Sequence, residues 1–205
     1  MITFVLIAVT VLVSWQAFEK RRMFERLVLW PPGVERFHQY DRLLTHGFVH
    51  ADWMHLLFNM ITLYFFGRAV ENVFGQLVGP AMYLVFYLSA IVVAILPSYL
   101  RHRKDSGYVS LGASGAVSAV LFAFVLVDPW SWIIVFVIPV PAVVYAIAYV
   151  GYSYWMDKRG RDSINHNAHL SGAIYGLLFM LLMEPRVGLL FLSKLANPRL
   201  PSFFG

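Results

Sequence analysis

The feature that most constrains this chain is a series of uncharged segments, each near the length that crosses a bilayer. The clearest runs from Ser106 to Val127, 22 residues without Asp, Glu, Lys or Arg. A membrane-spanning helix needs about 20 mostly apolar residues. Charged residues make up 13% of the chain, about half of the roughly 25% usual in soluble domains. The sequence therefore predicts a polytopic membrane protein.

Six segments qualify as spans, or nearly so, and they must be helical because lipid cannot satisfy backbone polar groups. They are Met1–Phe18, Asp52–Val70, Gly75–Leu100, Ser106–Val127, Trp130–Met156 and Ser163–Met183. Pro139 and Pro141 should kink or break the fifth. The predicted fold is an all-α membrane protein, a six-helix bundle over residues 1–183 with a short tail, residues 184–205.

The first segment could be a signal peptide or a retained anchor helix. We favour the anchor, because no basic residue precedes it, no A-x-A-like site follows, and Lys20-Arg21-Arg22 comes after it. The long linker, Glu19–Ala51, contains FERLVLWPPG, which predicts a short amphipathic turn at the membrane interface, stopped by Pro31-Pro32-Gly33.

Composition limits the partners and cofactors of the chain. It has no cysteine, which excludes disulfides, thiol catalysis and cysteine-ligated metal or haem. The net charge of +5 is typical of loops that meet lipid headgroups rather than of nucleic-acid binding. We therefore expect the lipid bilayer as a partner and no nucleic acid. The oligomeric state stays open, because lipid-facing and partner-facing surfaces are alike in composition.

Three polar residues should lie at one depth. His55, Ser114 and His169 are each followed by 12 to 14 uncharged residues before the next charge. At 1.5 Å per residue, each lies roughly 18–21 Å from the far boundary of a core about 30 Å thick. Asn59, one turn after His55, shares its face. These residues predict a polar cluster near one membrane surface.

Glycines flank the serine and follow the histidine at helical spacing, which lets helices approach closely. They are Gly112, Gly115, Gly172 and Gly176. A lone Gly-x-x-x-Gly face is usually only a packing surface, with Ser114 bonded to its own helix. A histidine on that face, level with the serine, favours a site instead.

A serine hydroxyl becomes nucleophilic when a histidine takes its proton, so Ser114 and His169 are candidates for that pair. His55, Asn59 and the free N–H groups of a helix beginning near Ser114 could stabilise an oxyanion. No carboxylate within the apolar spans is placed to orient His169. The residues therefore predict a Ser–His dyad.

Other membrane hydrolases fit less well. A zinc protease is disfavoured because H-E-x-x-H is absent. A Ser–Lys dyad is disfavoured because all four lysines lie in loops or the tail, and an aspartyl pair because Asp52 and Asp128 sit at helix ends. A metal site is not expected, because His46, His50 and His55 lack a carboxylate or thiol at their level. Two non-enzymes stay open: an inactive binder or chaperone of transmembrane clients, and a small transporter. The transporter is disfavoured because spans four to six hold no ionisable Asp, Glu, Lys or Arg.

Three motifs, in order, resemble the rhomboid family of intramembrane serine proteases: HGFVHADWMHLLFN at 46–59, GASGA at 112–116 and AHLSGAIYG at 168–176. The resemblance implies a Ser114 nucleophile, a His169 base, and an oxyanion site of His55, Asn59 and the Ser114 amide. It implies that His50 is a buried structural histidine and Glu71 a packing carboxylate. It also implies transmembrane protein substrates that enter beside the fifth helix, and no metal or cofactor.

This chain departs from the family pattern at two places. Asp41-Arg42 stands where many members have Trp-Arg, so the anchoring of that loop by Arg42 needs another partner. Ser118 stands where some members have a tyrosine that stacks on the histidine, so another group must hold His169.

The loops on the side of the polar cluster hold 12 of the 16 Lys and Arg residues, which would place that side in the cytoplasm by the positive-inside rule. The resemblance implies the reverse. We follow the resemblance and expect a bacterial inner-membrane protein with cytoplasmic termini.

Overall fold

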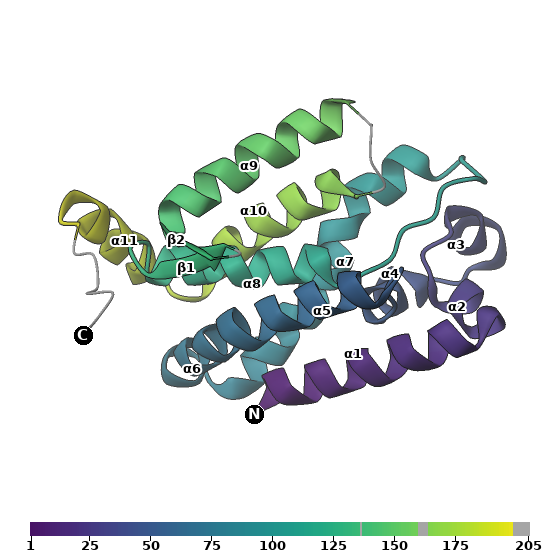
Figure 1. Cartoon of the computed structure of the whole chain (residues 1–205), viewed down its shortest axis with the longest axis horizontal. Coiled ribbons are helices and arrows are strands. Elements are labelled where there is room, and N and C mark those ends of the chain that lie inside the picture. The colour runs from purple at the N-terminus through teal and green to yellow at the C-terminus, as the bar shows by residue number, and fades with distance from the viewer. Residues whose placement is uncertain (136, 160–163, 199–205) are drawn as a thin grey trace.

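The computed structural model describes residues 1–135, 137–159 and 164–198, and its long helices run side by side in alternating directions (Figure 1). Three run one way: α1 (Ile2–Glu19), α7 (Pro80–His102) and α9 (Ala142–Arg159). The others return: α5 (Trp53–Thr62) with α6 (Arg68–Leu77), α8 (Ser114–Val127) and α10 (His166–Met183). Short elements fill the ends: α2 (Arg21–Leu27), α3 (Pro31–Phe37), α4 (Arg42–Thr45), a 3₁₀ turn (His46–Phe48) and α11 (Arg186–Ala196).

The mostly helical architecture agrees with the predicted all-α class. Two helices, α1 and α7, are long and apolar enough to cross a membrane. A third crossing is counted if α10 and α11, which meet at a bend of 114°, form one span. This count covers the described parts of the chain. It supports two or three crossings and does not confirm the predicted bundle of six. Helix α8 is apolar but has 14 residues.

The second predicted span is one continuous helix that passes through a π turn. That turn, η2 (Leu63–Gly67), joins α5 to α6, and the helix extends beyond Val70 to Leu77. A Cβ added at Gly67 would lie 2.8 Å from the Tyr83 hydroxyl, so this glycine lets α7 approach. Glu71 on α6 accepts hydrogen bonds from the backbone N–H groups of Ile2 (2.6 Å) and Thr3 (3.0 Å), which caps the start of α1.

The helix of the fourth span begins later than Ser106, at the position where free N–H groups were expected. Helix α8 starts at Ser114 rather than Ser106. Before it, Ser110 pairs with Leu29 of the linker through two backbone hydrogen bonds of 2.9 and 3.0 Å. Gly112 has φ +107°, a conformation that glycine adopts without strain. The segment before Ser114 is therefore held by the linker instead of by helical bonds.

The prediction of helix from Trp130 to Pro141 is wrong. These residues contain an antiparallel hairpin of β1 (Trp132–Val135) and β2 (Ile138–Pro141), and α9 begins at Ala142. Proline has no N–H and clashes with the preceding turn of a helix, so Pro139 and Pro141 stop a helix that composition alone would continue.

The linker also differs from the prediction. Pro31 begins α3 instead of stopping the preceding turn, because proline suits the first helical position, where its missing N–H has no intrahelical partner. The predicted tail contains a helix, α11, whose Val187 joins the core. The predicted sixth-span start at Ser163, the basic residue Arg161 and the tail from residue 199 lie outside the described residues.

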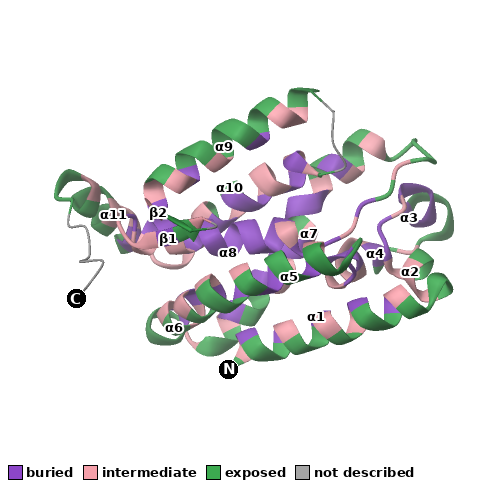
Figure 2. Ribbon diagram, viewed as in Figure 1, coloured by how far each residue is buried: buried purple, intermediate pink, exposed green. Residues whose placement is uncertain are grey.

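The core is centred on α8. Eleven of its 14 residues are buried, and Figure 2 shows α8 as the most continuously buried helix, with α7, α10 and α5 beside it. In contrast, three of the 18 residues of α9 are buried. The most enclosed helix thus begins at the serine that the sequence analysis singled out.

Candidate functional site

Helices α8 and α10 touch through their backbones. A Cβ added at Gly172 would collide with the carbonyl oxygen of Gly115, and one at Gly176 would collide with that of Ala119. Small residues permit this approach. It brings the first turns of the two helices together, with Ser114 as the first residue of α8 and His169 as the fourth of α10.

One cavity of about 1150 Å³ gathers the polar residues of the predicted site. Ser114, His169, His55 and Asn59 all line it. The lining also includes Arg101, His102, Asp105 and Asp157, which lie at the ends of α7 and α9. The cavity therefore extends from the predicted chemical groups to charged residues that water can reach.

The start of α8 can bind negative charge. Its N-cap, Ala113, makes no side-chain cap, and the first N–H groups of a helix have no intrahelical acceptor. The positive ends of the α8 and α10 dipoles both lie at the cavity, since Ser114 and His169 line it from the first turns of these helices. An oxyanion formed beside Ser114 would be stabilised by both effects.

His55 and Asn59 face the cavity from α5. Asp52 caps this helix by accepting from the His55 N–H at 2.8 Å. Asn59 uses one amide hydrogen to donate to the His55 carbonyl at 2.9 Å. A Cβ at Gly112 would lie 2.7 Å from His55 Cε1, so this glycine lets the loop before Ser114 pass against the imidazole ring.

His50 is fully buried and links three segments. The Ser14 hydroxyl donates to the Phe48 carbonyl at 2.9 Å, so its oxygen accepts from His50 Nδ1 at 3.0 Å. His50 Nε2 then accepts from the Ala113 N–H at 3.3 Å. Burial lowers the pKa of His50 to about 3, which keeps the ring neutral. His50 thereby holds the residue before Ser114 against α1.

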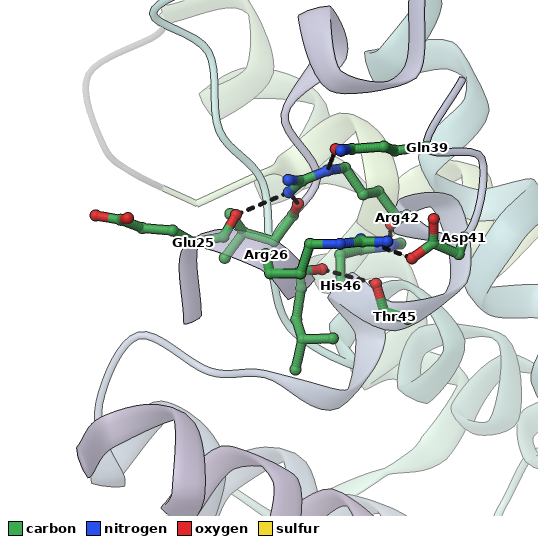
Figure 3. A network of polar contacts seen from close by, with 9 residues as sticks. Glu25, Arg26, Gln39, Asp41, Arg42, Thr45 and His46 are labelled. Atoms are coloured by element: carbon green, nitrogen blue, oxygen red, sulfur yellow. Dashed lines mark hydrogen bonds and ion pairs between the residues drawn. The ribbon is translucent and has the colours of Figure 1, made fainter. Parts of the chain in front are cut away.

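Arg42 holds the linker together (Figure 3). Its side chain is 5% exposed, and its Nη1 donates to the carbonyls of Glu25 (2.8 Å) and Val28 (2.7 Å). Its Nε donates to Gln39 Oε1 at 2.6 Å. A guanidinium group suits this use because its donors form a fixed planar fork.

Asp41, at the position where many family members carry tryptophan, accepts from Arg26 Nη1 at 2.7 Å. This bond lowers the pKa of the Asp41 carboxyl below its usual value. Thr45 adds a hydrogen bond to the Leu27 carbonyl at 2.9 Å. These two contacts with α2 therefore add to the anchoring by Arg42, in place of a tryptophan at position 41.

Tyr149 on α9 is a site residue that the sequence analysis missed. Its ring stacks on His169, with 5.9 Å between centroids and 22° between planes. Ser118 donates to the Ser114 carbonyl at 2.8 Å, so the Tyr149 hydroxyl donates to Ser118 at 2.5 Å. The group that stacks on His169 thus comes from α9 rather than from position 118.

Asn165 is a second missed residue, and it joins α10 to its surroundings. It caps α10 by accepting from the Ala168 N–H at 3.0 Å, and it also accepts from Ser98 of α7 at 2.8 Å. Its amide donates to the Tyr108 hydroxyl (2.9 Å) and to Ser110 (3.1 Å). An asparagine directly before a helical run is an N-cap signal, so the sequence carried this information.

His166 is the third missed residue. It is buried, and its ring meets the edge of His169 with 5.8 Å between centroids. Tyr152 of α9 approaches the His166 ring with 5.6 Å between centroids.

Within residues 1–135, 137–159 and 164–198, no group of three or more His, Asp or Glu side chains is arranged to hold a metal ion.

The chain matches known proteins over most of its length. Residues 38–186 match the family model for the rhomboid domain. RHOMBOID-like protein 12, mitochondrial, of Arabidopsis thaliana is 32% identical over 80% of this chain and 52% of its own length. Rhomboid-like protein 11, chloroplastic, of the same plant is 34% identical over 72% and 54%. Rhomboid protein 1, mitochondrial, of Saccharomyces cerevisiae is 30% identical over 67% and 40%.

The chain thus spans about half the length of the first two of these relatives. Their names place them in organelles, which does not support the predicted bacterial inner membrane. The family model covers the segment from the linker to the end of α10, including every residue that lines the cavity. The chain is a membrane protein of the rhomboid family.

Proposed function

We propose that this chain is an intramembrane serine endopeptidase that cleaves transmembrane segments of other proteins with a Ser114–His169 dyad. One observation carries the proposal: backbone contact between α8 and α10 places both residues in the wall of one cavity. The helix ends add a site for negative charge beside Ser114. Family membership supports the same activity.

In the proposed reaction, His169 takes the proton from Ser114 Oγ as this oxygen attacks the peptide carbonyl carbon. The carbonyl oxygen becomes an oxyanion, and His169 gives the proton to the leaving nitrogen as the C–N bond breaks. Water from the cavity then attacks the acyl-serine, and His169 takes the proton from this water. As the ester C–O bond breaks, His169 returns the proton to Ser114 Oγ, which leaves the new carboxyl group and the free serine.

The oxyanion would be bound by the Ser114 N–H, His55 and Asn59. The Ala51 N–H approaches His55 Nδ1 at 3.5 Å, an arrangement that leaves the Nε2 proton for the oxyanion. Asn59 retains one amide hydrogen beyond its bond to the His55 carbonyl. Removing one such donor typically costs about 10²–10³ in rate.

The proposal includes a bilayer with six crossings, in which α5, η2 and α6 count as one. Residues 1–183 would form the catalytic core and residues 184–205 a tail. The termini would be cytoplasmic and the cavity would open on the opposite side. A bacterial inner membrane stays a prediction without support from the relatives.

The test compares wild type with Ser114→Ala and His169→Ala in liposomes. A fluorophosphonate probe reports the nucleophile, and a transmembrane reporter reports cleavage. We expect wild type to label and cleave, both variants to leave the reporter uncut, and Ser114→Ala to stay unlabelled. Folded wild type that neither labels nor cleaves, yet retains the reporter, would favour the inactive client binder.

A further inference from the structure

The catalytic base of the proposed dyad shares a face with a tyrosine from another helix. Tyr149 and His169 line the same cavity, and their rings are nearly parallel, with 5.9 Å between centroids. An imidazole that takes a proton must point a ring nitrogen at the nucleophile, and ring rotation spoils this geometry. A ring stacked on one face restricts that rotation.

The Tyr149 ring is itself fixed on several sides. Phe122 of α8 approaches it with 5.7 Å between centroids, and Tyr145 approaches from the preceding turn of α9 at 5.9 Å. Its hydroxyl donates to Ser118, and Ser118 donates to the carbonyl of Ser114. A continuous path of contacts therefore runs from His169 through Tyr149 and Ser118 to the residue of the nucleophile.

The helix that carries Tyr149 is held much less firmly than α8. Three residues of α9 are buried, Ala142, Ala146 and Ser153. Near its far end, Asp157 forms an ion pair with Arg101 of α7 at 3.4 Å. The Arg101 side chain is half-exposed, and ion pairs that water can reach contribute little, about 0–1 kcal/mol. Tyr149 is thus a polar and aromatic contact between a loosely docked helix and the site.

We propose, on the basis of the proteolytic function above, that Tyr149 is a positioning residue that orients His169 from α9. It touches the base and, through Ser118, the backbone of the nucleophile, and it exchanges no proton with the substrate. Docking of α9 against α8 and α10 then sets how well His169 is aimed. Position 118 does not carry the stacking ring itself. Instead, the Ser118 hydroxyl accepts the hydrogen bond that fixes Tyr149.

The experiment measures the rate and the endpoint of fluorophosphonate labelling in liposomes, with kcat and KM for the reporter. Tyr149→Ala should label at least about tenfold more slowly and lose a similar factor in kcat. Its labelling endpoint should equal that of wild type, and its KM should stay within about twofold. Tyr149→Phe should recover most of the rate, because it keeps the stacked ring and loses only the hydrogen bond to Ser118.

The matched control is Tyr154→Ala, which removes a tyrosine from the same helix. Tyr154 is 54% exposed and its ring lies 4.4 Å from Lys158 Nζ, so its loss should leave the labelling rate unchanged. The inference is overturned if Tyr149→Ala labels at the wild-type rate, if its endpoint falls with the rate constant unchanged, or if Tyr149→Phe is as slow as Tyr149→Ala. A wild type that is not labelled at Ser114 defeats the proposed function first.

Discussion

Arg42 is a charged side chain in a buried position, and its surroundings explain how that is tolerated. Burying a charge is costly unless it is paired and hydrogen-bonded. Here the guanidinium donates to the backbone carbonyls of Glu25, in the last turn of α2, and of Val28, just after that helix, and to the side chain of Gln39. One residue thus satisfies groups from two separate parts of the linker.

Arg42→Ala should destabilise the protein by about 2–4 kcal/mol, because it leaves buried carbonyls without donors. Denaturation of the detergent-solubilised protein would measure this loss. Arg26→Ala is the matched control, since it removes a half-exposed arginine that pairs with Asp41, and it should cost less than about 1 kcal/mol. Equal losses in the two variants would contradict the assignment of Arg42 as the main anchor.

Acid should destabilise the fold through the buried histidines of the linker. Burial lowers the pKa of His46 to about 4 and that of His50 to about 3, from 6.5. Between pH 6.5 and the lowered pKa of each histidine, the unfolded chain binds a proton that the folded chain does not. The free energy of unfolding therefore falls as pH drops below about 6.5, by up to about 1.4 kcal/mol per pH unit for each histidine.

Unfolding midpoints at pH 7 and pH 5 would measure this dependence. His50→Gln should reduce the difference between the two midpoints, because it removes one of the titrating groups. His38→Gln, which changes an exposed histidine of the same linker, should leave the difference as in wild type. An unchanged difference in His50→Gln would show that His50 does not cause it.

At the scale of the helix, the contact between α8 and α10 depends on the lack of a side chain. Gly172→Ala places a methyl group against the Gly115 carbonyl, and overpacking of this kind costs about 1–3 kcal/mol. The helices must separate, so we expect a lower unfolding midpoint and at least about tenfold slower probe labelling.

Gly151→Ala is the control for that variant. Position 151 lies in α9, and a Cβ there meets nothing within 4 Å. Alanine favours the helix over glycine by up to about 1 kcal/mol, so stability should hold or rise. A Gly172→Ala protein as stable and as reactive as wild type would rule out the close backbone contact.

Two elements show what the sequence could and could not predict. Counting residues to the next charge predicted that Ser114 and His169 lie at one level, because a helix converts residue number into depth, and both residues do line one cavity. The hairpin at 132–141 could not be predicted, since its residues are as apolar as a span and the prolines mark a break without specifying strands. The stacking of Tyr149 on His169 depends on how α9 lies against α10, which is set by packing rather than by local sequence.

At the scale of the whole molecule, the alternating directions of the helices predict on which side of the membrane each connecting loop lies. Because the chain has no cysteine, single cysteines can be introduced for labelling with an impermeant maleimide. Six crossings predict that Arg22→Cys and Lys104→Cys react from one side of the membrane and Val78→Cys from the other. Reaction of Lys104→Cys and Val78→Cys from the same side would show that α7 does not cross. Unmodified protein should not react.

The slight burial of α9 has a consequence for how the protein responds to the surrounding lipid. Most of its surface is left for lipid, with Ile147 70% exposed and Tyr152 53% exposed. Acyl chains therefore compete with α8 and α10 for the same helix, and bilayer thickness should shift the balance. With Tyr149 orienting His169 from α9, we expect the membrane to act as an allosteric effector, so that turnover differs between lipids of different chain length at equal substrate density.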